Sequence, residues 1–125
     1  FGIIASMQPH LFGAGSDDFR AVIDSGAMLA FGSDASITDF NPLLGIHAAV
    51  NSDSRSITVE EAVKAYTLGS AFAEFQEKDK GTLAVGKLAD FVILSDDIFT
   101  IEKHRLEKTS VVMTVVGGKV AFERK

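Results

Sequence analysis

The stretch from Met28 to Asp34 constrains the fold of this chain more than any other feature. Its sequence, Met-Leu-Ala-Phe-Gly-Ser-Asp, is a short apolar run that passes into turn residues and then into a carboxylate. A continuous apolar run bounded by turn residues is typical of a strand buried in a parallel sheet with both faces covered. Asp34 is therefore predicted to follow the carboxyl end of a strand, where α/β proteins collect ligands and catalytic groups.

The same acid also has a simpler interpretation. An aspartate after a strand commonly forms a turn or caps a helix by accepting hydrogen bonds from backbone N–H groups. The next helix is predicted to begin at Pro42, and Asp39 and Asn41 lie closer to it as capping residues. Asp34 is thus left in the loop, and the residues alone leave both the turn-forming and the functional interpretation open.

Composition limits the class of protein. The chain has 125 residues, of which 46% are hydrophobic and 23% charged, as expected for one soluble globular unit. Its 12 basic and 17 acidic residues give a net charge of −5, and the basic residues are dispersed, which argues against a nucleic-acid partner. The absence of cysteine excludes disulfides and thiolate metal sites.

No signal peptide and no apolar run long enough to span a membrane is recognised, so the chain is predicted to be cytoplasmic with no membrane partner. The chain begins inside an apolar strand without an initiator methionine. We therefore expect that an amino-terminal portion is missing.

The first part of the chain is predicted to alternate strands and helices. The expected elements are a strand over 2–7, a helix starting at Ser16 to Asp18 and stopped by Gly26, a strand over 28–32, a helix from Asn41-Pro42, and a helix from a capping box of Thr58 and Glu61. Gly69 is expected to break or bend this last helix. After residue 80 the pattern predicts short extended pieces, a strand over 91–94 and a hairpin over 111–122 that turns at Gly117-Gly118.

Histidines are the other candidates for chemistry. His10 follows the first strand, within the turn Gln8-Pro9-His10, and is expected at the same sheet edge as Asp34; the alternative is a loop histidine that hydrogen-bonds the backbone. His47 lies on an apolar helix and is interpreted as a core histidine, and His104 stands among charged residues and is expected to be solvated. A divalent metal needs about three to four protein ligands, and this chain offers one good carboxylate.

Taken together, these motifs resemble the carboxyl-terminal portion of the metal-dependent amidohydrolase superfamily, closest to amidohydrolase family 3 with its N-substituted formamide deformylase-like members. The matching segments span nearly the whole chain: 5–10 (Ala-Ser-Met-Gln-Pro-His), 30–35 (Ala-Phe-Gly-Ser-Asp-Ala), 41–46 (Asn-Pro-Leu-Leu-Gly-Ile), 61–62 with 65–67, 80–83 with 86–90 (Gly-Lys-Leu-Ala-Asp), and 117–120 (Gly-Gly-Lys-Val). The pairing of Gly-Lys-Leu-Ala-Asp with an upstream Gly-Ser-Asp is more specific than either motif alone.

The resemblance implies an α/β architecture. Residues 1–80 would form the last strands and helices of a (β/α)8 TIM-type barrel, and residues 81–125 would form the carboxyl-terminal strands of a small β-sandwich. It also implies hydrolysis of non-peptide carbon–nitrogen bonds in a small amide- or formamide-type substrate. In that reaction Asp34 would be both a ligand of a divalent metal, zinc as one or two ions, and the proton shuttle for a metal-activated water.

The resemblance assigns substrate contacts to Gln8, His10 and Ser33, and it places most of the metal ligands before residue 1. The segment alone is therefore expected to be inactive and to expose apolar surface, so that it self-associates, for example as a homo-oligomer, or is poorly ordered. The alternative is a stand-alone α+β module that binds a small ligand or a protein partner without catalysis, in which Asp34 is a turn residue.

Overall fold

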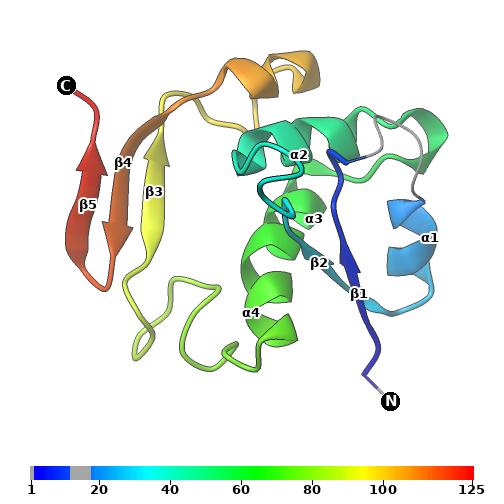
Figure 1. The fold of residues 1–125 in the computed structure, drawn as a ribbon, viewed down its shortest axis with the longest axis horizontal. Helices are drawn as coiled ribbons and strands as arrows, with labels where there is room; N and C mark the ends of the chain where they lie inside the picture. The colour runs from blue at the N-terminus through cyan, green and yellow to red at the C-terminus, as the bar shows by residue number, and fades with distance from the viewer. Residues whose placement is uncertain (1, 12–17) are drawn as a thin grey trace.

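The computed structural model describes residues 2–11 and 18–125 of the chain (Figure 1). In this part of the chain the strands form a two-stranded sheet of β1 and β2 and a three-stranded sheet in the order β3-β4-β5. Figure 1 shows the helices α2, α3 and α4 in the space between these sheets. No helix of the described residues is long and apolar enough to cross a membrane.

The first sheet is a parallel pair. Strand β1 (Ile4–Met7) pairs with β2 (Met28–Phe31), and the register runs from Ile4 opposite Met28 to Met7 opposite Phe31. The Gly32 amide extends the pairing by donating to the Met7 carbonyl oxygen at 3.1 Å. Both strands were predicted from their apolar runs, and their parallel arrangement places their carboxyl ends at one edge of the sheet.

Helix α1 (Phe19–Asp24) connects these strands. Asp18 caps it by accepting a hydrogen bond from the Ala21 amide at 2.9 Å. Ser16, which belongs to the predicted start signal, lies outside the described residues. The predicted stop is confirmed, because Gly26 has a positive φ of 81° that glycine adopts without steric cost.

Helix α2 (Pro42–Val50) begins as predicted, with Asn41 as its cap and proline in its first turn. The Asn41 Oδ1 atom accepts from the Leu43 amide at 3.1 Å. A short 3-10 turn, η1 (Asp53–Arg55), leads from α2 to the capping box. There the Thr58 side chain accepts from the Glu61 amide at 3.1 Å while Glu61 accepts from the Thr58 amide at 2.8 Å, as the sequence predicted.

The helix that starts at this box does not break at Gly69. It runs from α3 (Val59–Lys64) through a π-helical turn, η2 (Ala65–Gly69), into α4 (Ser70–Ala73), and Gly69 itself has helical φ and ψ of −61° and −47°. Of the predicted break or bend at Gly69, the break does not occur. The helix changes from π-helical to α-helical at this residue and continues into the predicted second piece. The glycine is explained by packing instead, since a Cβ atom there would lie 2.1 Å from the Leu29 carbonyl oxygen of β2.

The second sheet is antiparallel and consists of β3 (Phe91–Leu94), β4 (Val111–Val116) and β5 (Lys119–Glu123). Gly117 and Gly118 form the predicted hairpin turn, with φ angles of 56° and 76° that match the twist of the strands. A 3-10 segment, η3 (Lys103–Lys108), precedes β4. The division of the chain at residue 80 stays a prediction.

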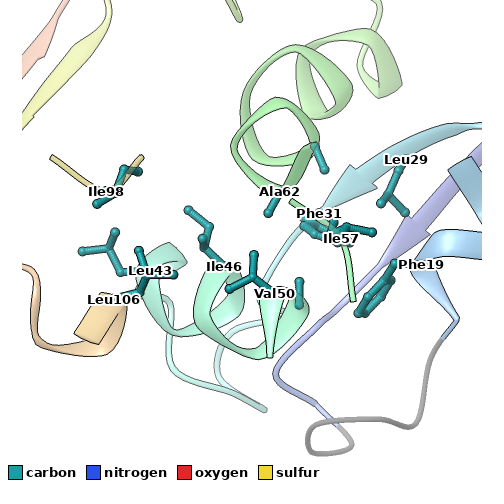
Figure 2. Close-up of a cluster of buried hydrophobic side chains, with 12 residues drawn as sticks. Phe19, Leu29, Phe31, Leu43, Ile46, Val50, Ile57, Ala62, Ile98 and Leu106 are labelled. Atoms are coloured by element: carbon teal, nitrogen blue, oxygen red, sulfur yellow. The ribbon is translucent and has the colours of Figure 1, made fainter. Parts of the chain in front are cut away.

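One hydrophobic cluster joins the first sheet, the helices and the segment between β3 and β4 (Figure 2). At its centre the Phe31 ring packs edge-to-face against Phe19 and Tyr66, with ring centroids 5.1 Å and 5.3 Å away. Ile98 and Leu106, which lie between β3 and β4 in the sequence, belong to the same buried cluster as Leu43 and Ile46 of α2. The segment between β3 and β4 therefore packs against α2 and completes the core there.

Large apolar side chains are also exposed on the second sheet. They are Phe91, Val92 and Ile93 of β3, Val116 of β4, and Val120 and Phe122 of β5. Phe40, before α2, is exposed as well. An exposed apolar sheet face and edge of this kind marks a surface that favours association.

Candidate functional site at the carboxyl edge of the parallel strands

The predicted site residues leave the first sheet at the same edge. Gln8 and His10 follow β1, and Ser33 and Asp34 follow β2. Met7 is opposite Phe31, and the Gly32 amide donates to the Met7 carbonyl. The two loops that carry these four residues therefore begin side by side at the end of the paired strands. The edge that the sequence predicted as a site is thus formed, while the roles of the four residues stay predictions.

The loop after β2 is a tight turn around Asp34. Its backbone carbonyl accepts from the Ile37 amide at 2.8 Å, and the Thr38 hydroxyl donates to the Ser33 carbonyl. Asp34 has a φ of 53°, in the left-handed region where aspartate and asparagine are tolerated better than most residues. Asp34 is exposed, and among residues 2–11 and 18–125 no basic side chain forms an ion pair with it.

The turn after β1 is built on Pro9, which is buried, and on a hydrogen bond from the Leu11 amide to the Gln8 carbonyl at 3.1 Å. Gln8 is half-buried and His10 is exposed. The buried proline fixes the backbone, because its ring holds φ near −65° and it has no amide hydrogen to satisfy. The His10 imidazole is therefore presented to solvent from a defined turn.

The other histidines have local partners. The side-chain amide nitrogen of Asn51, Nδ2, lies 3.4 Å from Nδ1 of His47. It donates to the His47 backbone carbonyl at 2.8 Å, at the end of α2. His47 is half-buried, in keeping with its interpretation as a core histidine. His104 is exposed, as predicted, and its Nε2 lies 3.2 Å from a Glu102 carboxylate oxygen.

The carboxylate of Asp34 fits one position of a metal site, but the described residues do not complete one. An exposed carboxylate without an ion pair has the oxygen donors that divalent cations accept. However, no group of three or more histidine, cysteine, aspartate or glutamate side chains in residues 2–11 and 18–125 is arranged to hold a metal. Any metal bound at Asp34 therefore needs ligands from outside these residues.

An apolar cavity of about 440 Å³ adjoins the edge. It extends from Gly32 and Ser33 along α2 and the Tyr66 ring to Val92 and Leu94 of β3. Burial raises the pKa of the Tyr66 hydroxyl to about 12, because it disfavours the ionised form. The cavity has the size of small-molecule sites, which range over roughly 300–1,000 Å³.

An ion pair holds α1 against α3 beside the sheet. Nη1 and Nη2 of Arg20 lie 3.0 Å and 2.6 Å from the two carboxylate oxygens of Glu61, which is the bidentate geometry of a strong arginine–carboxylate pair. The hydrogen bond from Arg20 is the main reason that the pKa of Glu61 falls to about 2. Glu61 thus serves both the cap of α3 and the attachment of α1.

Ser70 was not singled out in the sequence, although it touches the end of β2. Its hydroxyl oxygen lies 2.8 Å from the Phe31 carbonyl oxygen and 3.0 Å from that of Ala65. Serines in helices ordinarily hydrogen-bond to a carbonyl of their own helix. The sequence around Ser70 has no feature that would distinguish a contact with β2 from this ordinary bond.

The chain shares its fold with two solved enzyme structures. The chain aligns with guanine deaminase from E. coli at a TM-score of 0.76 and 19% identity, over 98% of this chain and 35% of that one. It aligns with an amidohydrolase from Thermotoga maritima at a TM-score of 0.71 and 21% identity, over 84% of this chain and 25% of that one. The α/β fold of the chain is therefore a fold found in amidohydrolases.

Sequence comparison identifies the family. The model of the amidohydrolase family matches residues 2–122, and the chain belongs to this family. The recognition made from the sequence motifs is confirmed. Members of the family are generally metal-dependent and act on small-molecule substrates.

Individual relatives agree with this assignment. The chain is 36% identical over 118 residues to YtcJ of Bacillus subtilis, which is named as an amidohydrolase; the match covers 85% of this chain and 22% of YtcJ. It is 29% identical over 121 residues to imidazolonepropionase of Bacteroides thetaiotaomicron (94% of this chain, 29% of the relative). It is 25% identical over 114 residues to N-substituted formamide deformylase of Arthrobacter pascens (84% and 21%). The chain spans about a fifth to a third of the length of these curated relatives.

Proposed function

We propose that this chain supplies the proton-transferring carboxylate, Asp34, to an amidohydrolase that hydrolyses non-peptide carbon–nitrogen bonds of small amide-type molecules. The observation that carries the proposal is the position of Asp34, which is exposed at the carboxyl edge of the parallel strands and free of ion pairs within residues 2–11 and 18–125. The family membership of the chain supports the class of reaction.

We further propose that the chain acts within a longer polypeptide, as the last barrel strands and part of a small β-sandwich. Its coverage of 22% of YtcJ supports this, as does the lack of a three-ligand group among the described residues. Asp34 would be one ligand of a divalent cation, with zinc as the proposed metal, and the other ligands would come from elsewhere in that polypeptide. When bound, such a cation lowers the pKa of a water molecule and polarises a carbonyl group.

The residues of this chain then have separate tasks. Asp34 accepts a proton from the attacking water and delivers it to the leaving amine, which a carboxylate does when it is within hydrogen-bond reach of both. Ser33, Gln8 and His10 contact the substrate from the same edge, and the cavity next to Ser33 accepts its apolar part. Because the substrate-selecting loops of such sites follow several different strands, this chain specifies only part of the pocket.

The proposal is tested by Asp34→Asn in the full-length protein. Asparagine keeps the shape and tolerates the φ of 53° at this position, so folding is retained. We expect turnover of an amide substrate to fall by at least about 100-fold, since general acid–base catalysis contributes about 10²–10⁴-fold.

Asp53→Asn is the matched control for this experiment. Asp53 is also an exposed aspartate with a positive φ, of 51°, but it lies in η1 and not at the strand edge. We expect this variant to keep wild-type turnover. Near-wild-type activity of Asp34→Asn would show that Asp34 is a turn residue, as in the stand-alone module without catalysis.

A further inference from the structure

The peptide group that joins Phe31 to Gly32 is held from both sides. Its N–H, on Gly32, donates to the Met7 carbonyl oxygen at 3.1 Å, and its C=O, on Phe31, accepts from the Ser70 hydroxyl at 2.8 Å. A peptide group is planar, so a bond to each of its two polar atoms fixes the orientation of the whole plane. The first bond comes from β1 and the second from Ser70, the first residue of α4; Figure 1 shows where these two elements lie.

This peptide plane determines where the chain goes after β2. Only Ser33 separates Gly32 from Asp34, so the direction of the Phe31–Gly32 plane sets the start of the turn that carries the carboxylate. Within residues 2–11 and 18–125 no ion pair fixes the exposed Asp34 side chain. The position of its carboxylate therefore depends on the backbone before it.

The helix packs directly on β2 at the end of its π-helical turn. η2 ends at Gly69, and the helix backbone comes so close to β2 there that a Cβ atom would meet the Leu29 carbonyl oxygen at 2.1 Å. The next residue, Ser70, then lies beside the Phe31 carbonyl, and its hydroxyl is also 3.0 Å from the Ala65 carbonyl, five residues back. A π-turn of this kind inside an α-helix is found frequently at functional sites.

We propose that Ser70 is a positioning residue of the active site, which holds the Phe31–Gly32 peptide and thereby places the Asp34 carboxylate. This inference rests on the proposed function, because it requires Asp34 to be a metal ligand and base. Ser70 itself touches neither substrate nor metal. Residues that orient metal ligands typically change metal affinity or activity by about 10- to 100-fold when they are altered.

The test compares five variants of the full-length protein: Ser70→Ala, Ser70→Thr, Ser52→Ala, Asp34→Asn and the double variant of Ser70→Ala with Asp34→Asn. Ser52→Ala is the matched control, because the buried Ser52 hydroxyl donates to the Ala48 carbonyl four residues back, at 2.7 Å, away from the strand edge. The measurements are kcat and KM for an amide substrate, zinc affinity by competition with a chelator, and the thermal unfolding midpoint.

We expect Ser70→Ala to lower kcat and zinc affinity by about tenfold each, with KM changed less than about twofold. Ser70→Thr should keep both values near those of the wild type because threonine also has a hydroxyl, and Ser52→Ala should match the wild type. In the Asp34→Asn background, Ser70→Ala should cause no additional loss of zinc affinity, since the residue acts through Asp34. If Ser70→Ala does not fold, Ser70→Cys, which keeps a weak donor, takes its place.

Two results would overturn the inference: wild-type kcat and zinc affinity in Ser70→Ala while Asp34→Asn loses both, or an equal loss of zinc affinity from Ser70→Ala with and without Asp34. The proposed function fails in a different way, which is that Asp34→Asn itself keeps wild-type kcat and zinc affinity.

Discussion

At the scale of single residues, the contact between Gly45 and Tyr66 shows how closely α2 packs on the helix after it. A Cβ atom on Gly45 would lie 1.9 Å from the Tyr66 hydroxyl oxygen and 2.8 Å from the ring carbon that bears it. The glycine is therefore required by a neighbouring side chain and not by an unusual backbone conformation. Tyr66 in turn packs on Phe31, at the end of β2.

Gly45→Ala should destabilise the protein by about 1–3 kcal/mol, because the extra methyl group overfills a packed interface. Tyr66→Phe removes the oxygen that the methyl group would meet, so the double variant should recover part of this loss. Denaturant unfolding of both single variants and the double variant measures the coupling. Gly2→Ala is the control, since nothing lies within 4 Å of a Cβ at that position. Purely additive losses would show that the two residues do not compete for the same space.

The residue scale also shows what sequence alone predicts well. Asn41, Thr58 and Glu61 were all predicted as capping residues, because a cap is decided within three or four residues of the chain. The packing reason for Gly69 could not be predicted, because it is the carbonyl of Leu29 in β2, forty residues earlier in the sequence. The contact of Ser70 was not predicted for the same reason, because its partner Phe31 lies 39 residues earlier in the chain.

At the scale of elements, the Arg20–Glu61 pair ties α1 to α3 and makes stability depend on pH. The pKa of Glu61 is about 2 in the folded protein, against 4.5 as its ordinary value, mainly through the hydrogen bond from Arg20. A carboxyl group whose pKa is lower in the folded state stabilises that state fully above its unfolded pKa. This stabilisation is lost as the pH falls from about 4.5 towards about 2.

Glu61→Gln should remove this dependence while it keeps the cap, because glutamine also serves at the third position of a capping box. We expect the free energy of unfolding of the wild type to fall more steeply than that of Glu61→Gln between pH 4.5 and pH 2. The free energies of unfolding of the two proteins should therefore differ most near pH 4.5 and least near pH 2. Urea unfolding across this range measures it. Glu60→Gln, on an exposed neighbour in the same helix, is the control. Parallel curves for wild type and Glu61→Gln would contradict the ion pair.

The elements themselves were largely predictable. Both parallel strands, the hairpin and the helices carried local apolar patterns and turn residues, and the structure forms them close to the expected bounds. The local pattern did not predict the π-helical turn η2, whose last residue, Gly69, packs against the strand β2. The sheet edge at which Gln8, His10, Ser33 and Asp34 lie could be predicted from the order of the strands. The roles of these residues could not be established, because the other residues of the proposed site lie outside this chain.

At the scale of the whole molecule, the exposed apolar side chains of the second sheet predict association of this chain when it is produced alone. Val120 and Phe122 of the edge strand β5 are 58% and 50% exposed. We expect sedimentation velocity to show dimers or larger species. Phe122→Lys should shift the chain towards monomer, because a charge on an edge strand opposes pairing.

Lys125→Ala, at the chain end, serves as the control for this measurement and should leave the distribution unchanged. A wild-type chain that sediments as a single monomeric species and unfolds cooperatively would contradict the prediction. It would favour the alternative of a stand-alone ligand-binding or interaction module.

The sharing of one core by both parts of the chain has a consequence for protein engineering. Leu106 is fully buried and Ile98 nearly so, and both belong to the cluster that contains Leu43 and Ile46 (Figure 2). A chimaera that exchanges everything after residue 80 with a homologue would replace Ile98 and Leu106 while keeping α2. Recombination there succeeds only when the donor brings side chains of matching volume at these positions, so a graft should exchange α2 and the segment from 98 to 106 as a unit.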